Sequence, residues 1–395
     1  MNAKYEIVVI GGGYAGVMAA NRLTKNAEAR ITLINPRRVF VPRLRMHQVA
    51  GGTHEGVVEY PDVLSEKVEL VIGSVTRIDA PARKVLLADG DSIAYDYLVY
   101  AVGSGNAAPS VPGAAEFTHP VATLEAAQRL RSLLRDTPTS APVTVIGGGP
   151  AGVETAAELA EQGRVVTLVC GGALVPYLHP KARRTAHKYL AKLGVTVLEG
   201  ADAVVTAVSA DAVELADGRI LDSAVTIWSA GFSIPDLAVR SGLSTDAAGR
   251  MLTDETLTSI DDERIVAAGD SSAPSELPFR MSAYTAYSLG AHAADTLLRR
   301  IAGESATPID MSFPAMCLSF GRNAGIYQIG RKNETATRVY ASGSIGRKLK
   351  EFACSAGVTH LSTEADKPGS HHWFKDGKYR PSLLADQANT AIPVA

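Results

Sequence analysis

Two copies of one glycine-rich turn constrain this chain more than any other feature. Residues 5–16 read YEIVVIGGGYAG, and residues 142–152 read PVTVIGGGPAG. In each copy a short apolar run meets glycines in the spacing G-x-G-x-x-G, and a helix-like segment follows. This strand–turn–helix pattern is typical of dinucleotide binding, because backbone amides and the positive end of the helix dipole face a pyrophosphate. One such motif is a weak signal, but the repeat predicts two nucleotide-binding domains built on the same plan.

The spacing gives each glycine a separate role. The first glycine of a copy permits the tight turn, the second lets a phosphate approach the backbone, and the third lets helix and strand pack closely. These are Gly11, Gly13 and Gly16 in the first copy and Gly147, Gly149 and Gly152 in the second. We expect the residues between them to lie in the same two cofactor sites; these are Tyr14, Ala15, Pro150 and Ala151.

A similar run of short strands follows each turn. Residues 68–103 and 195–231 alternate β-type segments with turn residues, and the tetrapeptide LADG occurs in both, at 87–90 and 215–218. We expect a small antiparallel meander in each half, followed by a buried strand that ends at Gly103 or at Gly231. A further strand, residues 264–268, leads to Gly269-Asp270 and then to a helix over residues 281–300. Asp270 is placed either to bind a polyol hydroxyl or to cap a helix.

Composition excludes several classes of function. The 395 residues carry a net charge of −2 and no basic field of the kind that nucleic acid requires. No apolar run approaches the roughly 18 residues of a membrane span, and the first strand begins too early to leave room for a secretory signal. Cys170, Cys317 and Cys354 lie far apart without metal-binding spacing, so we expect buried, inert thiols and no metal site. We therefore expect a cytoplasmic protein that does not bind nucleic acid.

Two segments leave alternatives open. Asn35 ends the second strand, where dinucleotide sites usually carry an acidic residue; it could hydrogen-bond a ribose without the charge, or serve as a turn residue before Pro36. Near the C-terminus, Ile345, Leu349 and Phe352 share one helical face. Packed core or a subunit contact is the preferred interpretation of this stripe, and a membrane surface is the alternative. The tail around residues 371–373 is expected to be irregular or partly ordered.

With these motifs in this order, residues 5–300 resemble the flavoproteins that have two dinucleotide-binding domains. The resemblance implies an α/β fold with two Rossmann-like domains, each with a β-meander, and a small α+β C-terminal domain. It implies an FAD-binding domain over residues 1–112 and 240–310, an NAD(P)H-binding domain over 113–239, and an acceptor-binding or dimerisation segment over 311–395. The residues at FAD positions are Gly11, Gly13, Tyr14, Ala15, Gly16, Asn35, Pro42, Val75, Ala101, Gly103, Gly269 and Asp270. Those at NAD(P)H positions are Gly147, Gly149, Pro150, Ala151, Gly152, Glu154, Cys170 and Gly231.

Three stretches narrow the resemblance. Disulfide reductases carry a C-x-x-x-x-C pair after the second strand, whereas residues 39–50 read VFVPRLRMHQVA, so glutathione-reductase-like chemistry is excluded. The same stretch and residues 149–159, GPAGVETAAEL, resemble type II NADH:quinone oxidoreductases, whose acidic residue near nicotinamide and flavin matches Glu154. Residues 313–330, FPAMCLSFGRNAGIYQIG, are closer to the apoptosis-inducing-factor-like quinone reductases, which include the ferroptosis suppressor flavoprotein.

Two positions depart from the type II pattern. Residues 283–288, AYTAYS, lack both glutamines that type II dehydrogenases place beside the quinone, and Tyr284 is the residue that ferroptosis-suppressor-like proteins favour. Cys170 stands where NADH-preferring proteins usually have an acidic residue. Without a carboxylate to repel a 2′-phosphate, both NADH and NADPH remain open.

The resemblance implies an FAD-dependent NAD(P)H:quinone oxidoreductase, in which hydride passes from NAD(P)H to FAD and two electrons then pass to a quinone. Glu154 would position the nicotinamide ribose or relay protons, or would only be an acid near a helix N-terminus. Tyr284 and Tyr287 would face the acceptor or be packed core aromatics. A reductase of a small redox protein such as ferredoxin or rubredoxin, and an NADH-sensing flavoprotein like apoptosis-inducing factor, are the alternatives. A homodimer and peripheral contact with the inner face of the membrane are consistent with the same resemblance.

Overall fold

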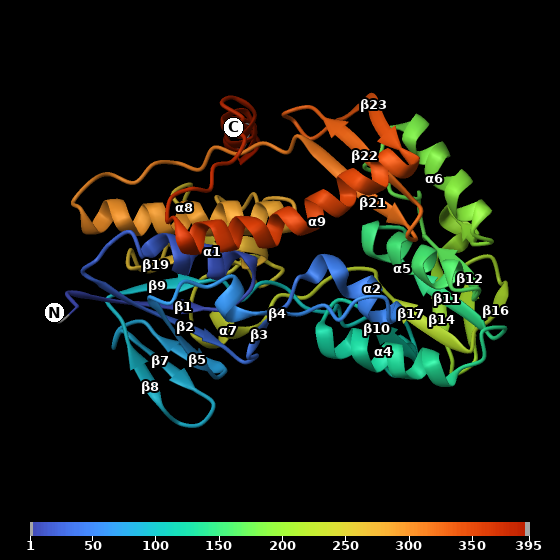
Figure 1. Cartoon of the computed structure of the whole chain (residues 1–395), viewed down its shortest axis with the longest axis horizontal. Helices are drawn as coiled ribbons and strands as arrows, with labels where there is room; N and C mark the ends of the chain where they lie inside the picture. The colour runs from blue at the N-terminus through green and yellow to red at the C-terminus, as the bar shows by residue number, and fades with distance from the viewer. Residues whose placement is uncertain (1–2, 392–395) are drawn as a thin grey trace.

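The computed structural model describes residues 3–391, which form two α/β units and a C-terminal sheet with a long helix (Figure 1). In the first unit, five parallel strands pair in the order β19-β9-β1-β2-β5. These strands are β1 (Tyr5–Ile10), β2 (Ala29–Asn35), β5 (Val68–Ile72), β9 (Tyr97–Tyr100) and β19 (Ile265–Ala267). The pairing of β19 with β9 supports the prediction that residues 240–310 complete the first domain.

Two helices fix the position of the first glycine turn. α1 (Tyr14–Leu23) is buried along its whole length and packs against α8 (Ala283–Ile301). The two helices approach closely, because a side chain at Gly290 of α8 would collide with the backbone of Ala15. The predicted first meander is the antiparallel set β6 (Val75–Asp79), β7 (Lys84–Leu87) and β8 (Ser92–Ala94).

The second unit repeats this plan. Its parallel sheet has the order β10-β17-β11-β12-β13. The strands are β10 (Thr118–Pro120), β11 (Pro142–Ile146), β12 (Val165–Val169), β13 (Thr196–Leu198) and β17 (Val225–Trp228), with a meander of β14 (Val205–Val208), β15 (Ala212–Leu215) and β16 (Ile220–Asp222). Its main helices are α4 (Leu124–Asp136), α5 (Pro150–Glu161) and α6 (Pro180–Lys192).

The C-terminal segment adds an antiparallel sheet and two helices. The sheet consists of β21 (Ala315–Phe320), β22 (Ala324–Gly330) and β23 (Ala336–Ser342), and the helices are α9 (Gly343–Asp366) and α10 (Tyr379–Ala391). Figure 1 shows α9 running from this sheet back along α1 of the first unit. The predicted α/β class, with two Rossmann-like domains and a small α+β C-terminal domain, is confirmed. The domain limits remain predictions, and residues 392–395 lie outside the described part of the chain.

The remaining elements of the described chain are short. They are β3 (Val39–Phe40), β4 (Val58–Glu59), β18 (Met251–Thr253), β20 (Ser272–Pro274), α2 (Met46–Gly51), α3 (Ala114–Phe117) and α7 (Leu237–Arg240). Among the helices described in residues 3–391, none is long and apolar enough to cross a membrane.

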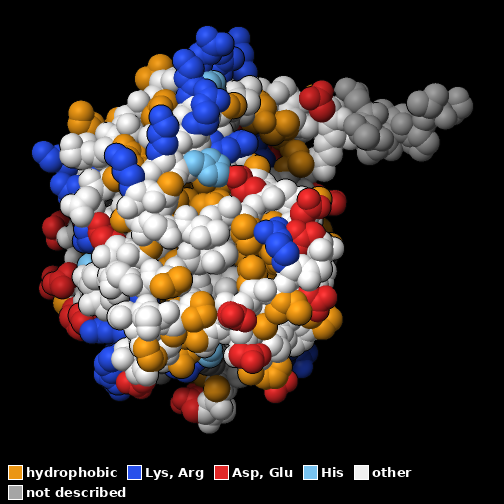
Figure 2. All heavy atoms as spheres, turned by 90° about the vertical axis from the view of Figure 1, so that its right-hand side faces the viewer, with side chains coloured by type: hydrophobic (Ala, Val, Ile, Leu, Met, Phe, Trp, Pro, Cys, Tyr) orange, Lys and Arg blue, Asp and Glu red, His pale blue; other side chains and the backbone are white. Residues whose placement is uncertain are grey.

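The predicted packing of the apolar stripe on α9 into the core is wrong. Ile345 and Phe352 are 63% and 72% exposed, and Leu349 is only half-buried. The buried face of α9 is set by another series, spaced by three or four residues, which comprises Gly346, Lys350, Cys354, Gly357, Leu361 and Glu364. The stripe is therefore left for a subunit contact or a membrane surface. Figure 2 shows Lys and Arg side chains gathered at the top of the face that lies on the right in Figure 1, with hydrophobic side chains scattered below them.

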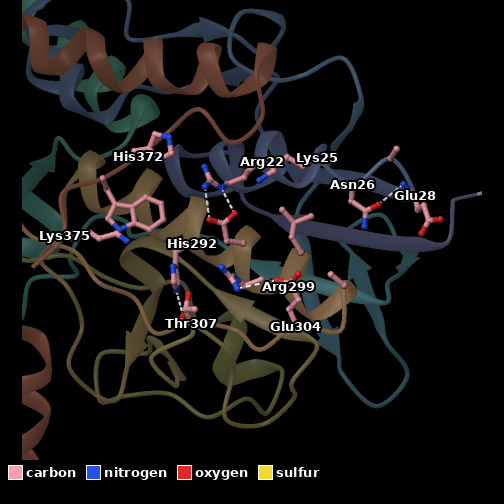
Figure 3. Close-up of a pocket in the computed structure, with 15 residues that line it drawn as sticks. Arg22, Lys25, Asn26, Glu28, His292, Arg299, Glu304, Thr307, His372 and Lys375 are labelled. Atoms are coloured by element: carbon pink, nitrogen blue, oxygen red, sulfur yellow. Dashed lines mark hydrogen bonds and ion pairs between the residues drawn. The ribbon is translucent and has the colours of Figure 1, made fainter. Parts of the chain in front are cut away.

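The tail around residues 371–373 has no regular secondary structure, as predicted, but it is packed against the first unit. Arg22 of α1 organises it: its guanidinium binds both Asp295 oxygens at 2.7 and 2.8 Å, Glu364 at 3.2 Å and the carbonyl oxygen of His371 at 3.1 Å. Figure 3 shows Arg22 with His292 and Lys375 around a cavity of about 890 Å³ at this end of the molecule. The contacts of Arg22 thus join α1 to α8, α9 and the tail.

Replacing Arg22 with Ala should destabilise the protein strongly. Glu364 is fully buried and would lose its cation, which costs about 3–5 kcal/mol when one partner of a buried pair is removed. Arg30→Ala is the matched control, because Arg30 pairs with Glu69 at 2.9 Å on the surface, where such pairs contribute at most about 1 kcal/mol. Urea-induced unfolding of the two variants at neutral pH measures the difference. Equal losses from both variants would contradict a central role for Arg22.

Candidate functional site

The first glycine turn forms an open cradle at the carboxyl end of β1. Gly11 has a φ of +102°, and a side chain there would strike the carbonyl oxygen of Ala101. Nothing lies within 4 Å of where a Cβ on Gly13 would be, and no side chain caps the α1 N-terminus that starts beside it. Gly16 packs against the Gly11 carbonyl. The amides of this turn are thus available to an anionic ligand.

Asn35 holds this turn in place. Its Oδ1 accepts a hydrogen bond from the Gly12 amide at 3.0 Å, and its Nδ2 donates to the Arg37 carbonyl at 2.8 Å. Tyr60 adds a hydrogen bond from its hydroxyl to the Gly12 carbonyl at 2.9 Å. Both ends of the Asn35 amide are therefore engaged with backbone, which favours the turn interpretation over direct ribose recognition.

Several of the predicted FAD positions meet around this turn. Gly269 packs on Ala15, and the Gly103 amide donates to the Ser271 hydroxyl at 3.3 Å. Pro42 is buried at the start of the segment that leads into α2, and Val75 begins β6 next to Gly73, whose amide donates to the Asn35 carbonyl at 3.0 Å.

Asp270 does not cap a helix, because its partners lie on other segments. Its Oδ2 accepts from the Ser104 hydroxyl at 2.7 Å and lies 3.6 Å from the Arg43 guanidinium. Arg43 also donates to the Ser104 carbonyl at 3.0 Å and, in the second unit, to the Ala122 carbonyl at 3.2 Å. Asp270 is therefore held at the junction of the two units. Neither Ser104 nor Arg43 was identified from the sequence.

The second glycine turn repeats the first. Gly147 has a φ of +129°, Gly152 packs against its carbonyl, and space around Gly149 is open. Gly149 precedes α5, which begins at Pro150 and continues with Ala151, and no side chain caps it. The cradle again faces an uncapped helix N-terminus.

Two further predicted residues flank this second turn. Cys170 follows β12 and lies against the turn, since a Cβ on Gly148 would be 2.9 Å from its Sγ. Gly231 has a φ of +74° and follows β17, where the chain crosses between the units through paired hydrogen bonds of Gly105 and Ser233.

Glu154 lies at the centre of a buried ionic cluster. Its Oε1 accepts from the Ser319 amide at 2.8 Å and from the Ser319 hydroxyl at 3.1 Å, and lies 3.0 Å from Lys350 Nζ. Its Oε2 lies 3.7 Å from His47 Nδ1. Glu154, Lys350 and His47 are each at most 6% exposed. The cluster thus joins α5 to α2, β21 and α9.

The charges in this cluster stabilise one another. Burial alone would raise the pKa of Glu154, but Lys350, then His47 and the Ser319 amide, hold that pKa below its ordinary value. Burial opposes the charge on Lys350, but Glu154 outweighs it and raises the pKa of the ammonium. Burial lowers the pKa of His47 to about 4, so this imidazole is neutral at physiological pH.

Three polar groups near this cluster have unused hydrogen-bonding capacity. The ammonium of Lys350 has three donors, and Glu154 is its one hydrogen-bond partner among residues 3–391. His47 Nε2 and the Tyr14 hydroxyl are buried and have no hydrogen-bond partner in the described chain. Tyr14 begins α1 and packs against Gly357 of α9, so the first glycine turn and this cluster meet along α9. Buried polar groups without partners are rare in native proteins and point to a bound molecule.

The sequence did not point to Lys350 or His47. A signal for Lys350 was present, because it is a charged residue within the mostly small and apolar series that forms the buried face of α9. Cys317 and Cys354 lie close enough to Lys350 to affect its pKa. Burial raises the pKa of Cys317 to about 11, so this thiol is neutral at physiological pH. All three cysteines are free, and none forms a disulfide.

Tyr284 makes its contacts with the C-terminal segment. Its hydroxyl accepts a hydrogen bond from the Phe374 amide at 2.9 Å, and its ring packs edge-on against Phe313 at 6.0 Å. Tyr287, one helical turn on, packs against Tyr14 at 6.3 Å. The structure therefore supports the packed-aromatic interpretation of Tyr284. The ring of Tyr287, by contrast, contacts Tyr14, which directly follows Gly13 of the first glycine turn.

The residues present at both turns fit the pyrophosphate of a dinucleotide cofactor. Both turns offer open backbone amides beside an uncapped helix N-terminus. The Tyr14 hydroxyl and His47 Nε2, which have no hydrogen-bond partner in the described chain, and the Lys350 ammonium lie where α1, α2, α5 and α9 meet.

Comparison with known proteins agrees with this geometry. The chain is 27% identical over 335 residues to the NADH dehydrogenase-like protein YutJ of Bacillus subtilis, covering 81% of this chain and 91% of that protein. It is 31% identical over 295 residues to the type II NADH:quinone oxidoreductase Ndh of Mycobacterium tuberculosis, covering 63% of each. It is 26% identical over 351 residues to ferroptosis suppressor protein 1 of Xenopus laevis, covering 82% and 90%.

A solved structure shares the fold of this chain. The structure of NDH2 from Plasmodium falciparum in complex with NADH superposes with a TM-score of 0.76 at 15% identity, covering 93% of this chain and 99% of that one. That similarity shows the fold, and the relatives named above confirm both narrower resemblances drawn from the sequence. The family model described as pyridine nucleotide-disulphide oxidoreductase matches residues 5–290. Since this match spans most of the chain, the protein belongs to the pyridine nucleotide-disulphide oxidoreductase family.

Proposed function

We propose that this protein is an FAD-dependent NAD(P)H oxidoreductase whose electron acceptor is a quinone. The observation that carries the proposal is the buried Glu154–Lys350 pair, which joins a helix that starts at the second glycine turn to a helix that packs on Tyr14 of the first. FAD, when bound, accepts hydride from a pyridine nucleotide and passes two electrons to an acceptor. The absence of a cysteine pair in residues 39–50 argues that the acceptor receives these electrons without a disulfide relay.

The chain's residues divide into two binding sets and one charged centre. The amides around Gly13 would hold the FAD pyrophosphate, and Asp270 would exchange its Ser104 or Arg43 partner for a ribityl hydroxyl. The amides around Gly149 would hold the pyrophosphate of NAD(P)H. Both sets use backbone groups, which bind phosphate without added charge.

The charged centre supplies oriented donors. The ammonium of Lys350 would offer its remaining N–H groups to the ring carbonyls of a bound ligand, and Glu154 keeps it protonated and fixed. The neutral imidazole of His47 can accept or donate a proton at Nε2, and its Nδ1 faces Glu154. Quinone reduction consumes protons, so a proton-carrying centre of this kind suits that acceptor.

Breaking the Glu154–Lys350 pair from one side should be worse than removing it entirely. Lys350→Met leaves the buried carboxylate without its cation and should cost about 3–5 kcal/mol, whereas Glu154→Gln combined with Lys350→Met should recover most of that loss. Denaturant unfolding of the flavin-loaded protein measures both. Since the pKa of Glu154 is depressed, the stabilisation is present above the ordinary carboxyl pKa of about 4.3 and is lost as pH falls below it. Additive losses at neutral pH would contradict the pairing.

Reduction and reoxidation of the bound flavin distinguish the acceptor classes. Anaerobic NADH or NADPH should bleach the visible flavin absorbance, and a short-chain quinone should restore it rapidly, with two electrons passed per flavin. Lys350→Met should slow this cycle by a factor on the order of 100, and Lys188→Met on exposed α6 is the control that should leave it unchanged. Solved ferredoxin reductases share the fold, so ferredoxin is added in parallel. Reoxidation by ferredoxin but not by quinone would overturn the quinone assignment in favour of that alternative.

We also propose that the exposed stripe on α9 contacts a membrane surface. Ile345 and Phe352 are exposed, the basic residues Arg347 and Lys348 lie on the same helix, and quinones with isoprenoid tails reside in lipid. Type II dehydrogenases among its relatives act on quinones. A cytoplasmic protein held peripherally at the inner face of the membrane fits these features.

Vesicle flotation tests the membrane proposal. The protein should float with anionic phospholipid vesicles, and Ile345→Ser with Phe352→Ser should abolish flotation, because exposed apolar groups and nearby cations act together. Ile220→Ser is the control, since Ile220 is 69% exposed on the meander of the second unit. If the wild type stays with the soluble fraction while the double variant dissociates a dimer in light scattering, the stripe is a subunit contact instead.

A further inference from the structure

A carboxylate from a neighbouring strand lies beside Cys170 in the second unit. Glu199 directly follows β13, and β13 pairs with β12. The Cys170 amide donates to the Leu198 carbonyl at 2.8 Å, and the Gly200 amide donates to the Gly172 carbonyl at 2.9 Å. The residues on either side of Glu199 are thus tied to the loop that follows β12.

The Glu199 side chain is held in this position at both oxygens. Oε1 accepts a hydrogen bond from the Leu174 amide, and Oε2 lies 2.9 Å from His187 Nε2 of α6. Leu174 lies in the loop that follows Cys170, so the carboxylate bridges that loop to α6. Its side chain remains 30% exposed, which leaves it accessible to a ligand in the cradle.

The residue at the end of the second strand of the first unit, Asn35, shows which polar contact Cys170 does not make. There the strand-end residue Asn35 bonds the glycine turn through its amide oxygen. Cys170 lies in the same relation to Gly148, but burial, with Glu199 as a second cause, raises the pKa of its thiol to about 12. The strand end therefore carries no negative charge at physiological pH, and Glu199 supplies the carboxylate nearest to it along the paired strands.

We infer that Glu199 is the residue that makes this protein select NADH over NADPH. In Rossmann-type sites the adenosine ribose lies at the end of the second strand, where a carboxylate binds the 2′-hydroxyl and repels a 2′-phosphate. Glu199 reaches that strand end from β13 and replaces the carboxylate that Cys170 does not provide. The inference rests on the proposed function, because it requires a pyridine nucleotide at the second glycine turn.

Charge alone accounts for a measurable effect. Two like charges several ångströms apart near a protein surface repel by roughly 1–4 kcal/mol, and 1.4 kcal/mol corresponds to about a tenfold change in affinity. Removing this one charge should therefore change NADPH binding far more than NADH binding.

Calorimetric titration of the flavin-loaded protein with NAD⁺ and NADP⁺ tests this directly, without an electron acceptor. The wild type should bind NAD⁺ about tenfold or more tightly than NADP⁺. Glu199→Gln keeps the shape of the side chain and one acceptor oxygen for the Leu174 amide, and should tighten NADP⁺ about tenfold while NAD⁺ changes by less than about threefold. Asp202→Asn is the matched control, because it removes an equal charge three residues away on the exposed turn that follows.

The outcomes separate this inference from the proposed function. If the wild type binds NADP⁺ as tightly as NAD⁺, or more tightly, the selectivity role of Glu199 is overturned but the proposed function is not. The same is true if Glu199→Gln and Asp202→Asn shift NADP⁺ affinity equally, because the effect would then be general electrostatics. Failure of the wild type to bind either dinucleotide overturns the proposed function, and this inference with it.

Discussion

The ion pair between Glu154 and Lys350 is the interaction on which the rest of the site depends. Each partner is almost completely buried, and a buried charge without a partner is far more costly than a well-packed apolar residue. Glu154 belongs to the second unit and Lys350 to α9 of the C-terminal segment. Displacing either part would therefore expose a charge to solvent or leave a buried charge without its partner. Ser319 and His47 complete the enclosure from β21 and α2. The site is thus assembled from four segments.

α9 transmits this constraint to the first unit. Its 24 residues span about 36 Å at roughly 1.5 Å per residue, and a buried ion pair fixes it toward each end. Lys350 binds Glu154 near the beginning, and Glu364 binds Arg22 near the end. Between them, Gly357 lets the helix pack on Tyr14 at the first glycine turn. A single helix therefore contacts the helices that follow both glycine turns and fixes the position of one turn relative to the other. Transfer between two bound cofactors would require such a fixed arrangement.

The parts of the structure predicted from the sequence are those with local signals. The glycine spacing and the repeated meanders predicted both cradles because a turn, its strand and its helix are contiguous in the chain. The buried face of α9 and the packing of the tail were not predicted, because long-range contacts decide them. Hydrophobicity favoured Ile345 and Phe352 for the interior, yet the buried face carries Lys350 and Glu364 beside two glycines, Cys354 and Leu361. Lys350 pairs with a carboxylate almost 200 residues away.

The two cradles also show why cofactor identity is harder to derive than cofactor class. Both turns use the same backbone geometry, so both are suited to a pyrophosphate, and what differs is the residue at the end of the next strand. Asn35 and Cys170 are neighbours of their turns in space, and each could be examined in the sequence. Glu199 could not, because its proximity to Cys170 depends on the pairing of β12 with β13. Selectivity thus resides in a contact between strands, and a motif confined to one βα unit cannot encode it.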